Sequence, residues 1–193
     1  MAKTIAVTGF HGGARFITAN FDASLVATGA WLSPGVKVWN GKTGELVHSF
    51  DTPDTTSVAF SPDNRFLVLA SAENYEVWQV ESWTHKFTIP QEPGNDFVPM
   101  MAFSPDGRIL AGTHSRRIVR LHSALTGEVL ADLEPPEPHA VTSVCFNNDG
   151  TRLAVCEGYE AVRIWDLTAI RSRLAPLGLD WELPPQPANQ AGR

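Results

Sequence analysis

Apolar and polar positions along the chain follow a pattern that returns about every forty residues. In its clearest copy, the mostly apolar VPMMAF at 98–103 leads through the turn SPDG into RILAGT and the alternating IVRLH at 118–122, and EVLADL completes the unit. Pro105, Asp106 and Gly107 suit successive positions of a tight turn, with Gly107 in the left-handed conformation. The pattern predicts four short antiparallel strands in each unit.

Two independent landmarks keep this period. The aromatic residues Phe21, Phe60, Phe103 and Phe146 are 39, 43 and 43 residues apart. The segments VKVW, YEVW, VRLH and VRIW end at Trp39, Trp78, His122 and Trp165, with gaps of 39, 44 and 43 residues. A period of roughly 40–45 residues is that of a propeller blade. We therefore predict an all-β fold, a β-propeller of four four-stranded antiparallel blades in a partial arc or small ring, with blades at about 14–50, 54–90, 96–133 and 140–170.

These residues resemble the WD-repeat β-propeller family. The resemblance covers about residues 3–170 and is carried by SVAFSPDN, MAFSPDGRILAG, SVCFNNDGTRLAV and VRIWD at 162–166. The chain departs from the family pattern because only Trp165 is followed by Asp and because His122 replaces the third tryptophan. The resemblance implies a buried polar network in each blade. Its candidate members here are Thr28 with Trp39, Ser71 with Trp78, Trp165, His11 and His139.

The two ends of the repeat region raise the question of closure. Closed propellers contain about four to eight blades, so four is a small number. A blade buries its faces only against neighbours, and an arc therefore leaves apolar flanks at both ends. Residues 3–10 alternate like an outermost strand, and in the family such a strand latches the last blade, which has no obvious fourth strand here.

After the last repeat the pattern becomes helical. Leu167, Ile170, Leu174 and Leu177 fall at helical spacing, and we expect Thr168 to cap the first turn. Pro176 and Gly178 would end the helix, Trp181 would hold the tail on the propeller, and 173–193 would form the helix end and a proline-rich tail. The tail IRSRLAPLGLDWELPP resembles that of WD-repeat regions in large bacterial multidomain proteins, some of which carry serine/threonine kinase domains.

Charge and hydropathy narrow the class of partner. The formal net charge is −6, which argues against general binding to nucleic acid or to anionic membrane surfaces, because both require a basic face. No apolar run approaches the ~18 residues of a membrane span. We expect a soluble cytoplasmic chain. Cys145 and Cys156 lie on adjacent predicted strands, so a disulfide is conceivable, but two buried free thiols fit a reducing compartment better.

No catalytic, cofactor-binding or metal-binding motif emerges from the sequence. GKTGE at 41–45 contains the GKT of a phosphate-binding loop, but Val36 stands where the motif needs glycine. The histidines form neither an HExxH pair nor a zinc cluster. His114 and His122 are eight residues apart, and a packed His122 explains this pair better than a shared metal. We therefore expect a protein that is not an enzyme.

The remaining candidate for function is a binding surface. In propellers that resemble this chain, the loops from second to third strand share one rim with the loops between blades, and partners dock there. The first group of loops contains Trp31, Asn74, Tyr75, His114, Arg116, Arg117 and Tyr159. Aromatic and arginine side chains are common in interface hot spots.

Three functional hypotheses follow. The leading one is a non-catalytic scaffold that binds a protein or peptide on this rim. The second is a truncated propeller that associates with a second copy into an eight-blade dimer or completes a larger propeller. The third, a propeller hydrolase with its site in the central opening, is less favoured because no catalytic motif supports it.

Overall fold

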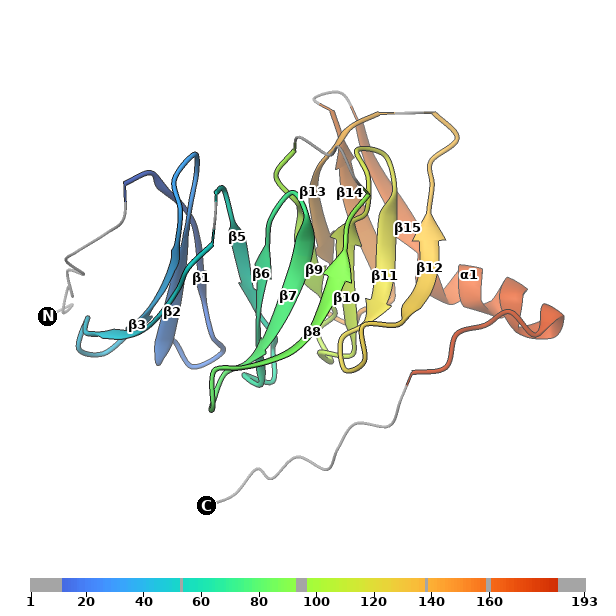
Figure 1. Cartoon of the computed structure of the whole chain (residues 1–193). Coiled ribbons are helices and arrows are strands. Elements are labelled where there is room, and N and C mark those ends of the chain that lie inside the picture. The colour runs from blue at the N-terminus through green and yellow to red at the C-terminus, as the bar shows by residue number, and fades with distance from the viewer. Residues whose placement is uncertain (1–11, 53, 93–96, 138, 159–160, 184–193) are drawn as a thin grey trace, which may run out of the picture.

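The computed structural model consists of four antiparallel sheets, each a meander of consecutive strands (Figure 1). The structure describes residues 12–52, 54–92, 97–137, 139–158 and 161–183. The first sheet contains β1 (Ala14–Ala19), β2 (Leu25–Ala30), β3 (Val36–Asn40) and β4 (Leu46–Phe50). The second contains β5 (Ser57–Phe60), β6 (Phe66–Ala70), β7 (Asn74–Gln79) and β8 (Thr84–Pro90).

The third sheet contains β9 (Met101–Phe103), β10 (Ile109–Thr113), β11 (Val119–Ser123) and β12 (Val129–Leu133). The fourth contains three described strands, β13 (Val141–Phe146), β14 (Arg152–Glu157) and β15 (Ala161–Asp166). The predicted latching strand at 3–10 lies outside the described residues. Each sheet corresponds to one repeat of the sequence, so the predicted all-β propeller fold is confirmed.

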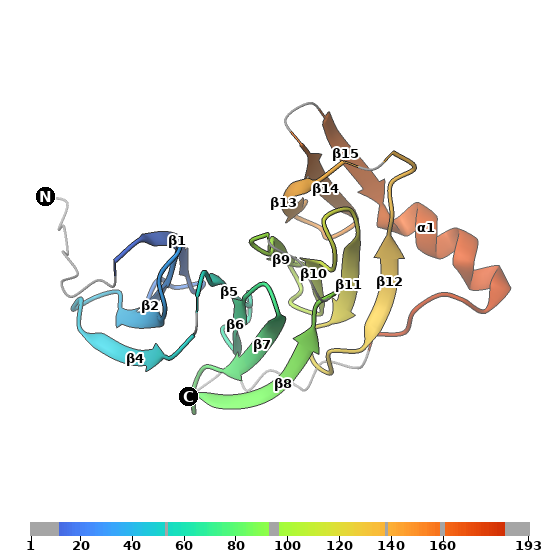
Figure 2. The same cartoon turned by 45° about the horizontal axis from the view of Figure 1, so that its top comes forward.

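The four sheets, which we call blades, stack face to face in chain order. The innermost strands β1, β5, β9 and β13 contact one another in succession. The first and fourth blades lie at opposite ends in both views, so the blades form an open arc (Figures 1 and 2). Apolar side chains fill the spaces between successive blades in three core clusters. Every internal blade is therefore covered on both faces.

The first turn of every blade is built in the same way. Asn20, Ser61, Ser104 and Asn147 each accept, through a side-chain oxygen, a hydrogen bond of 2.9 Å from the backbone N–H five residues later. Three residues after each of these, the backbone is left-handed, at Ala23, Asn64, Gly107 and Gly150. The predicted left-handed Gly107 is confirmed.

This turn corrects the alignment of the first repeat. Phe21 is 85% exposed and occupies the place of Pro62 and Pro105 in the later turns. The repeat position that Phe60 occupies in the second blade is occupied in the first blade by Ala19. Ala19 pairs with Val26 as Phe60 pairs with Leu67. The first copy was misaligned by two residues because it has no aromatic side chain at the anchor position.

The C-terminal segment packs under the last two blades. Helix α1 (Leu167–Leu174) is followed by the short 3-10 helix η1 (Ala175–Leu177), and Gly178 ends it in the left-handed conformation. Leu167 and Trp181 are buried in the core cluster between the third and fourth blades. The predicted short helix and the anchoring role of Trp181 are confirmed. The cap is Asp166, not Thr168, because β15 runs directly into the helix.

We expect the change Asp166→Ala to lower the free energy of unfolding by about 1 kcal/mol, because the Asp166 carboxylate accepts a hydrogen bond of 2.8 Å from the Ala169 N–H. Thr168→Ala is the matched control and is expected to have little effect. Urea denaturation of the two variants measures the difference. Equal losses would contradict the assignment of the cap.

Candidate functional site

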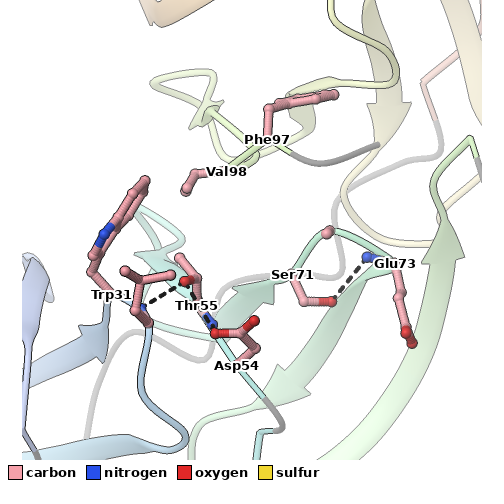
Figure 3. Close-up of a pocket in the computed structure, with 9 residues that line it drawn as sticks. Trp31, Asp54, Thr55, Ser71, Glu73, Phe97 and Val98 are labelled. Carbon is pink, nitrogen blue, oxygen red and sulfur yellow. Dashed lines mark hydrogen bonds between the residues drawn. The ribbon is translucent and has the colours of Figure 1, made fainter. Parts of the chain in front are cut away.

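A cavity of about 400 Å³ lies where loops of the first three blades meet (Figure 3). We call it the rim cavity. It is lined by the β2–β3 loop, the β4–β5 linker, the β6–β7 turn and the β8–β9 linker. The residues they contribute are Trp31, Leu32, Asp54, Thr55, Ser71, Ala72, Glu73, Phe97 and Val98.

One wall of the rim cavity is held by hydrogen bonds between the first blade and the linker that follows it. The Leu32 N–H donates to Thr55 Oγ1 at 2.8 Å, and Asp54 Oδ1 accepts from the Thr55 N–H at 2.6 Å. The Trp31 N–H donates to the Gly13 carbonyl at 2.8 Å, and the Arg15 guanidinium lies 4.3 Å from the centre of the Trp31 ring. These contacts orient an exposed indole at the mouth of the cavity.

The opposite wall is a tight turn between β6 and β7. Ser71 Oγ accepts hydrogen bonds of 3.3 Å from the N–H groups of Glu73 and Asn74. Gln91 stabilises the turn through two hydrogen bonds. Its side-chain amide donates to the Ser71 carbonyl at 2.8 Å, and its backbone N–H donates to the Glu73 carbonyl at 2.9 Å. The turn therefore presents Glu73 on a fixed backbone.

The lining combines apolar surface with negative charge. Trp31, Leu32, Phe97 and Val98 provide the apolar part, and Figure 3 shows Trp31 and Val98 on one side with Glu73 across the cavity. Asp54 provides a second carboxylate. Such a lining suits a ligand with an apolar group beside a cation, because the carboxylates attract the cation while the rings and aliphatic groups exclude water. Within the described parts of the chain, no group of three or more His, Cys, Asp or Glu is placed to hold a metal.

The predicted rim residues fall in different surroundings. Trp31 lines the rim cavity, and Asn74, half-buried, begins β7 directly after the turn. His114 is half-buried, whereas Arg116 and Arg117 are exposed on the β10–β11 loop. These three lie on the third blade and not in the cavity. Tyr159 lies outside the described residues.

Tyr75 is not available on the rim. Its ring is buried between the second and third blades, and its hydroxyl donates to the Thr113 carbonyl at 2.7 Å. Burial raises the pKa of Tyr75 well above its ordinary value. The expectation that Tyr75 contacts a partner is therefore corrected, because alternation along β7 places Tyr75 and Val77 on the same buried face.

The cavity also contains residues that sequence reasoning did not single out. Leu32, Asp54, Phe97 and Val98 come from a loop and from linkers between blades, where the four copies differ in sequence and length. The only signal for them was the general rule that inter-blade loops share the rim with the second-to-third strand loops.

Among the described residues, one bond of the predicted polar network is present, in the first blade. Trp39 Nε1 donates to Thr28 Oγ1 at 3.1 Å, as expected. Trp78 Nε1 donates to Glu76 Oε2 and not to Ser71. The Ser71 hydroxyl instead accepts hydrogen bonds within the turn between β6 and β7, which lines the rim cavity. His139 is exposed, and His11 lies outside the described residues.

His122 is a packed core residue, as the sequence predicts. Its Nδ1 lies 3.0 Å from the Gly127 carbonyl, and burial lowers its pKa below the ordinary value. The pKa of His122 in the folded chain therefore lies below its pKa in the unfolded chain. Its contribution to the free energy of unfolding is greatest above about pH 6.5 and falls as the pH falls, because the unfolded chain then binds the proton more readily. The residue contributes to stability and not to a site.

Both cysteines carry free thiols. Cys145 is exposed and Cys156 is half-buried, so the expectation of two buried thiols is wrong. They lie on the face of the fourth blade that points away from the third blade, and no other described blade covers that face.

Comparison with known proteins supports the reading of the repeats. The family model described as WD domain, G-beta repeat matches residues 44–75 and 128–166. Each match begins before the last strand of one blade and ends in the third strand of the next. None of the described helices is long and apolar enough to cross a membrane.

Three known proteins are similar to this chain over most of its length. The chain is 29% identical over 164 residues to WD repeat-containing protein SL1-17 of Schistosoma mansoni, covering 82% of this chain and 52% of that protein. It is 24% identical to actin-interacting protein 1 of Drosophila melanogaster (73% and 24% covered) and 28% identical to periodic tryptophan protein 2 of Arabidopsis thaliana (79% and 17% covered). The chain thus spans about half or less of the length of these relatives. The matched repeats and the stacked blades make this chain similar to WD-repeat proteins.

Proposed function

We propose that the chain is a non-catalytic scaffold that binds a protein or peptide partner in the rim cavity. The observation that carries this proposal is the convergence of Trp31, Leu32, Phe97 and Val98 around a cavity of about 400 Å³. An exposed aromatic residue in a concave apolar site is typical of an interface hot spot. The WD-repeat relatives support a role in protein interaction.

The chemistry of the lining defines the partner. An aromatic or aliphatic side chain of the partner would pack on Trp31 and Phe97, and an adjacent lysine or arginine would lie near Glu73 and Asp54. The net charge of −6 favours the same basic partner through long-range attraction. The proposed partner segment is therefore an exposed peptide with a basic residue beside an apolar one.

A displayed peptide library selected on the purified chain tests this function. Peptides enriched on the wild type are expected to combine an aromatic or aliphatic residue with lysine or arginine. Their affinity should fall at least about 10-fold in Trp31→Ala, because the indole supplies much of the buried contact. Phe21→Ala is the matched control, since Phe21 is an exposed aromatic residue on the turn at the other end of β2.

A charge reversal sharpens the test. Glu73→Lys should shift the selection from basic to acidic peptides while the apolar preference remains. Peptides that bind Trp31→Ala and Phe21→Ala equally well, or a selection that ignores Glu73→Lys, would contradict binding in the rim cavity.

Two broader assignments belong to the same proposal. A cytoplasmic location rests on the composition and on the free thiols, which suit a reducing compartment. Kinship with the WD-repeat regions of large bacterial multidomain proteins rests on the tail at 170–185 alone. Fractionation of cells that produce the tagged chain, and the reading frame around its gene, test these two assignments.

A further inference from the structure

The fourth blade ends in an open strand edge where the other three blades carry a further strand. In those blades the fourth strands β4, β8 and β12 pair with the third strands β3, β7 and β11. β15 holds the position of a third strand, because it pairs with β14 in the register in which β11 pairs with β10. Within the described residues, no strand pairs with the other edge of β15. Such an edge offers backbone N–H and C=O groups to an added strand.

The three complete blades show which residues a strand on this edge needs. In each fourth strand, three consecutive residues lie across from the start of the third strand. These triplets are His48-Ser49-Phe50, Phe87-Thr88-Ile89 and Ala131-Asp132-Leu133. The middle residue always carries a side-chain oxygen, and the last residue is always apolar and buried. The chain therefore uses one rule for its fourth strands three times.

β15 offers the same contacts to a strand that follows this rule. Val162, Arg163 and Ile164 correspond to Val119, Arg120 and Leu121 of the third blade. Val162 is 64% exposed and Ile164 is 63% exposed, so both can pack against apolar side chains of an added strand. Arg163 contacts Glu157 through Nε and Nη2. Its third nitrogen, Nη1, can donate to the side-chain oxygen of the middle residue, and the Arg163 side chain is 31% exposed.

We propose that the open edge of β15 binds an extended segment of a partner protein as a fourth antiparallel strand. The segment has an oxygen-bearing residue across from Arg163, between two apolar residues across from Val162 and Ile164. Backbone hydrogen bonds supply the affinity of such a contact, and alternate side chains supply its specificity. The site lies on a different blade from the rim cavity, so it does not depend on peptide binding there.

A second copy of β15 does not meet this requirement. In a symmetric antiparallel pair, the register that sets Val162 across from Ile164 of the other copy also sets Arg163 across from the other Arg163. Like charges directly opposite each other destabilise a pair of strands. The rule found in the three complete blades therefore favours a different sequence, with Ser, Thr or Asp at the middle position.

A peptide that copies residues 84–90, THKFTIP, is the probe, because this segment contains the whole of β8. In the register of β8 on β7, its phenylalanine lies across from Ile164, its threonine across from Arg163 and its isoleucine across from Val162. Fluorescence anisotropy of the labelled peptide on the full chain measures binding. Val162→Glu should weaken it at least about 10-fold, because the new charge lies beside the isoleucine of the peptide. Circular dichroism establishes that the variant is folded.

Two variants of the chain are controls. Val129→Glu places the same charge on an exposed residue of β12 and should leave the affinity unchanged. Trp31→Ala removes the indole of the rim cavity and should also leave it unchanged, which separates the two sites. Equal affinities of Val162→Glu and Val129→Glu, or no binding at about 1 mM peptide, would overturn the proposal. Loss of binding in Trp31→Ala would assign the peptide to the rim cavity instead.

Methylation of peptide nitrogens tests whether the peptide binds as a strand. Successive N–H groups of a strand point to opposite sides, so one faces β15 and the next faces away. One peptide is methylated on the phenylalanine and isoleucine nitrogens and another on the threonine nitrogen. Only one of the two should lose its affinity. Equal affinities of the two methylated peptides would contradict an added strand.

Hydrogen exchange of the β15 amides locates the bound peptide. Alternate amides of β15 face the open edge, and saturating peptide should slow their exchange at least about 10-fold. If these amides were already protected in the free chain, another segment of the chain would occupy the edge. If higher protein concentration alone protected them, a second copy would occupy it. Either result would overturn the proposal.

Discussion

Gly29→Ala is expected to lower the free energy of unfolding by about 3 kcal/mol, although alanine normally suits a strand better than glycine. Gly29 lies near the end of β2, and a methyl group there would overlap the carbonyl oxygen of Thr56 on the linker to the second blade. The linker cannot retreat easily, because the Thr56 N–H donates to the Ala30 carbonyl at 3.1 Å. The first two blades would have to separate locally.

Urea denaturation measures this loss, and Gly12→Ala is its control because a methyl group at Gly12 meets nothing within 4 Å. The same linker carries Asp54 and Thr55, so Gly29→Ala should also weaken peptide binding in the rim cavity. A Gly29→Ala chain as stable as Gly12→Ala would show that the linker does not cross the first blade as described.

Arg163→Met is expected to lower the free energy of unfolding clearly more than the matched change in the third blade does, because it leaves a buried carboxylate without its partner. Glu157 is 1% exposed, and both of its oxygens accept hydrogen bonds from Arg163, at 2.6 and 3.0 Å. Glu157→Leu added to Arg163→Met should recover much of the loss, since it removes the unpaired charge.

The third blade offers a matched control for this pair. Arg120 occupies the same position of the repeat and contacts Asp132 through two hydrogen bonds of 2.6 and 2.8 Å, but the Asp132 side chain is 42% exposed. Arg120→Met should therefore cost no more than about 1 kcal/mol. Thermal or urea unfolding of both variants compares them. If Arg163→Met and Arg120→Met lowered the free energy of unfolding equally, the burial of Glu157 would not be what makes the loss of its arginine partner unfavourable.

The sequence was sufficient to predict the architecture because each blade repeats one physical plan. The turn residues Ser61, Ser104 and Gly107, and the alternation along the third strands, recur at a constant period and identify the sheets. The burial of His122 followed from the same comparison of copies, whereas the bond between Trp39 and Thr28 followed from the resemblance to WD-repeat proteins. A feature that repeats can be checked against its other copies.

The rim cavity was harder to predict because its parts do not repeat. Asp54, Phe97 and Val98 lie in linkers of different length, and only folding brings them beside Trp31. Tyr75 was misplaced because proximity to a loop was given more weight than strand alternation. The uncovered outward side of the fourth blade appears only when the exposures of equivalent residues such as Val38 and Ile164 are compared.

The central claim, that each repeat folds as its own sheet and stacks on the next, is tested most directly by nuclear Overhauser contacts between blades. A methyl group built on Gly112 would lie 2.8 Å from the Tyr75 ring, and one on Gly127 would lie 2.8 Å from the Phe87 ring. We therefore predict strong contacts from the α protons of Gly112 to the Tyr75 ring and from those of Gly127 to the Phe87 ring, with upfield shifts of the glycine protons. Absence of both contacts, together with backbone contacts that pair β8 with β9 in one continuous sheet, would contradict the stacked arrangement.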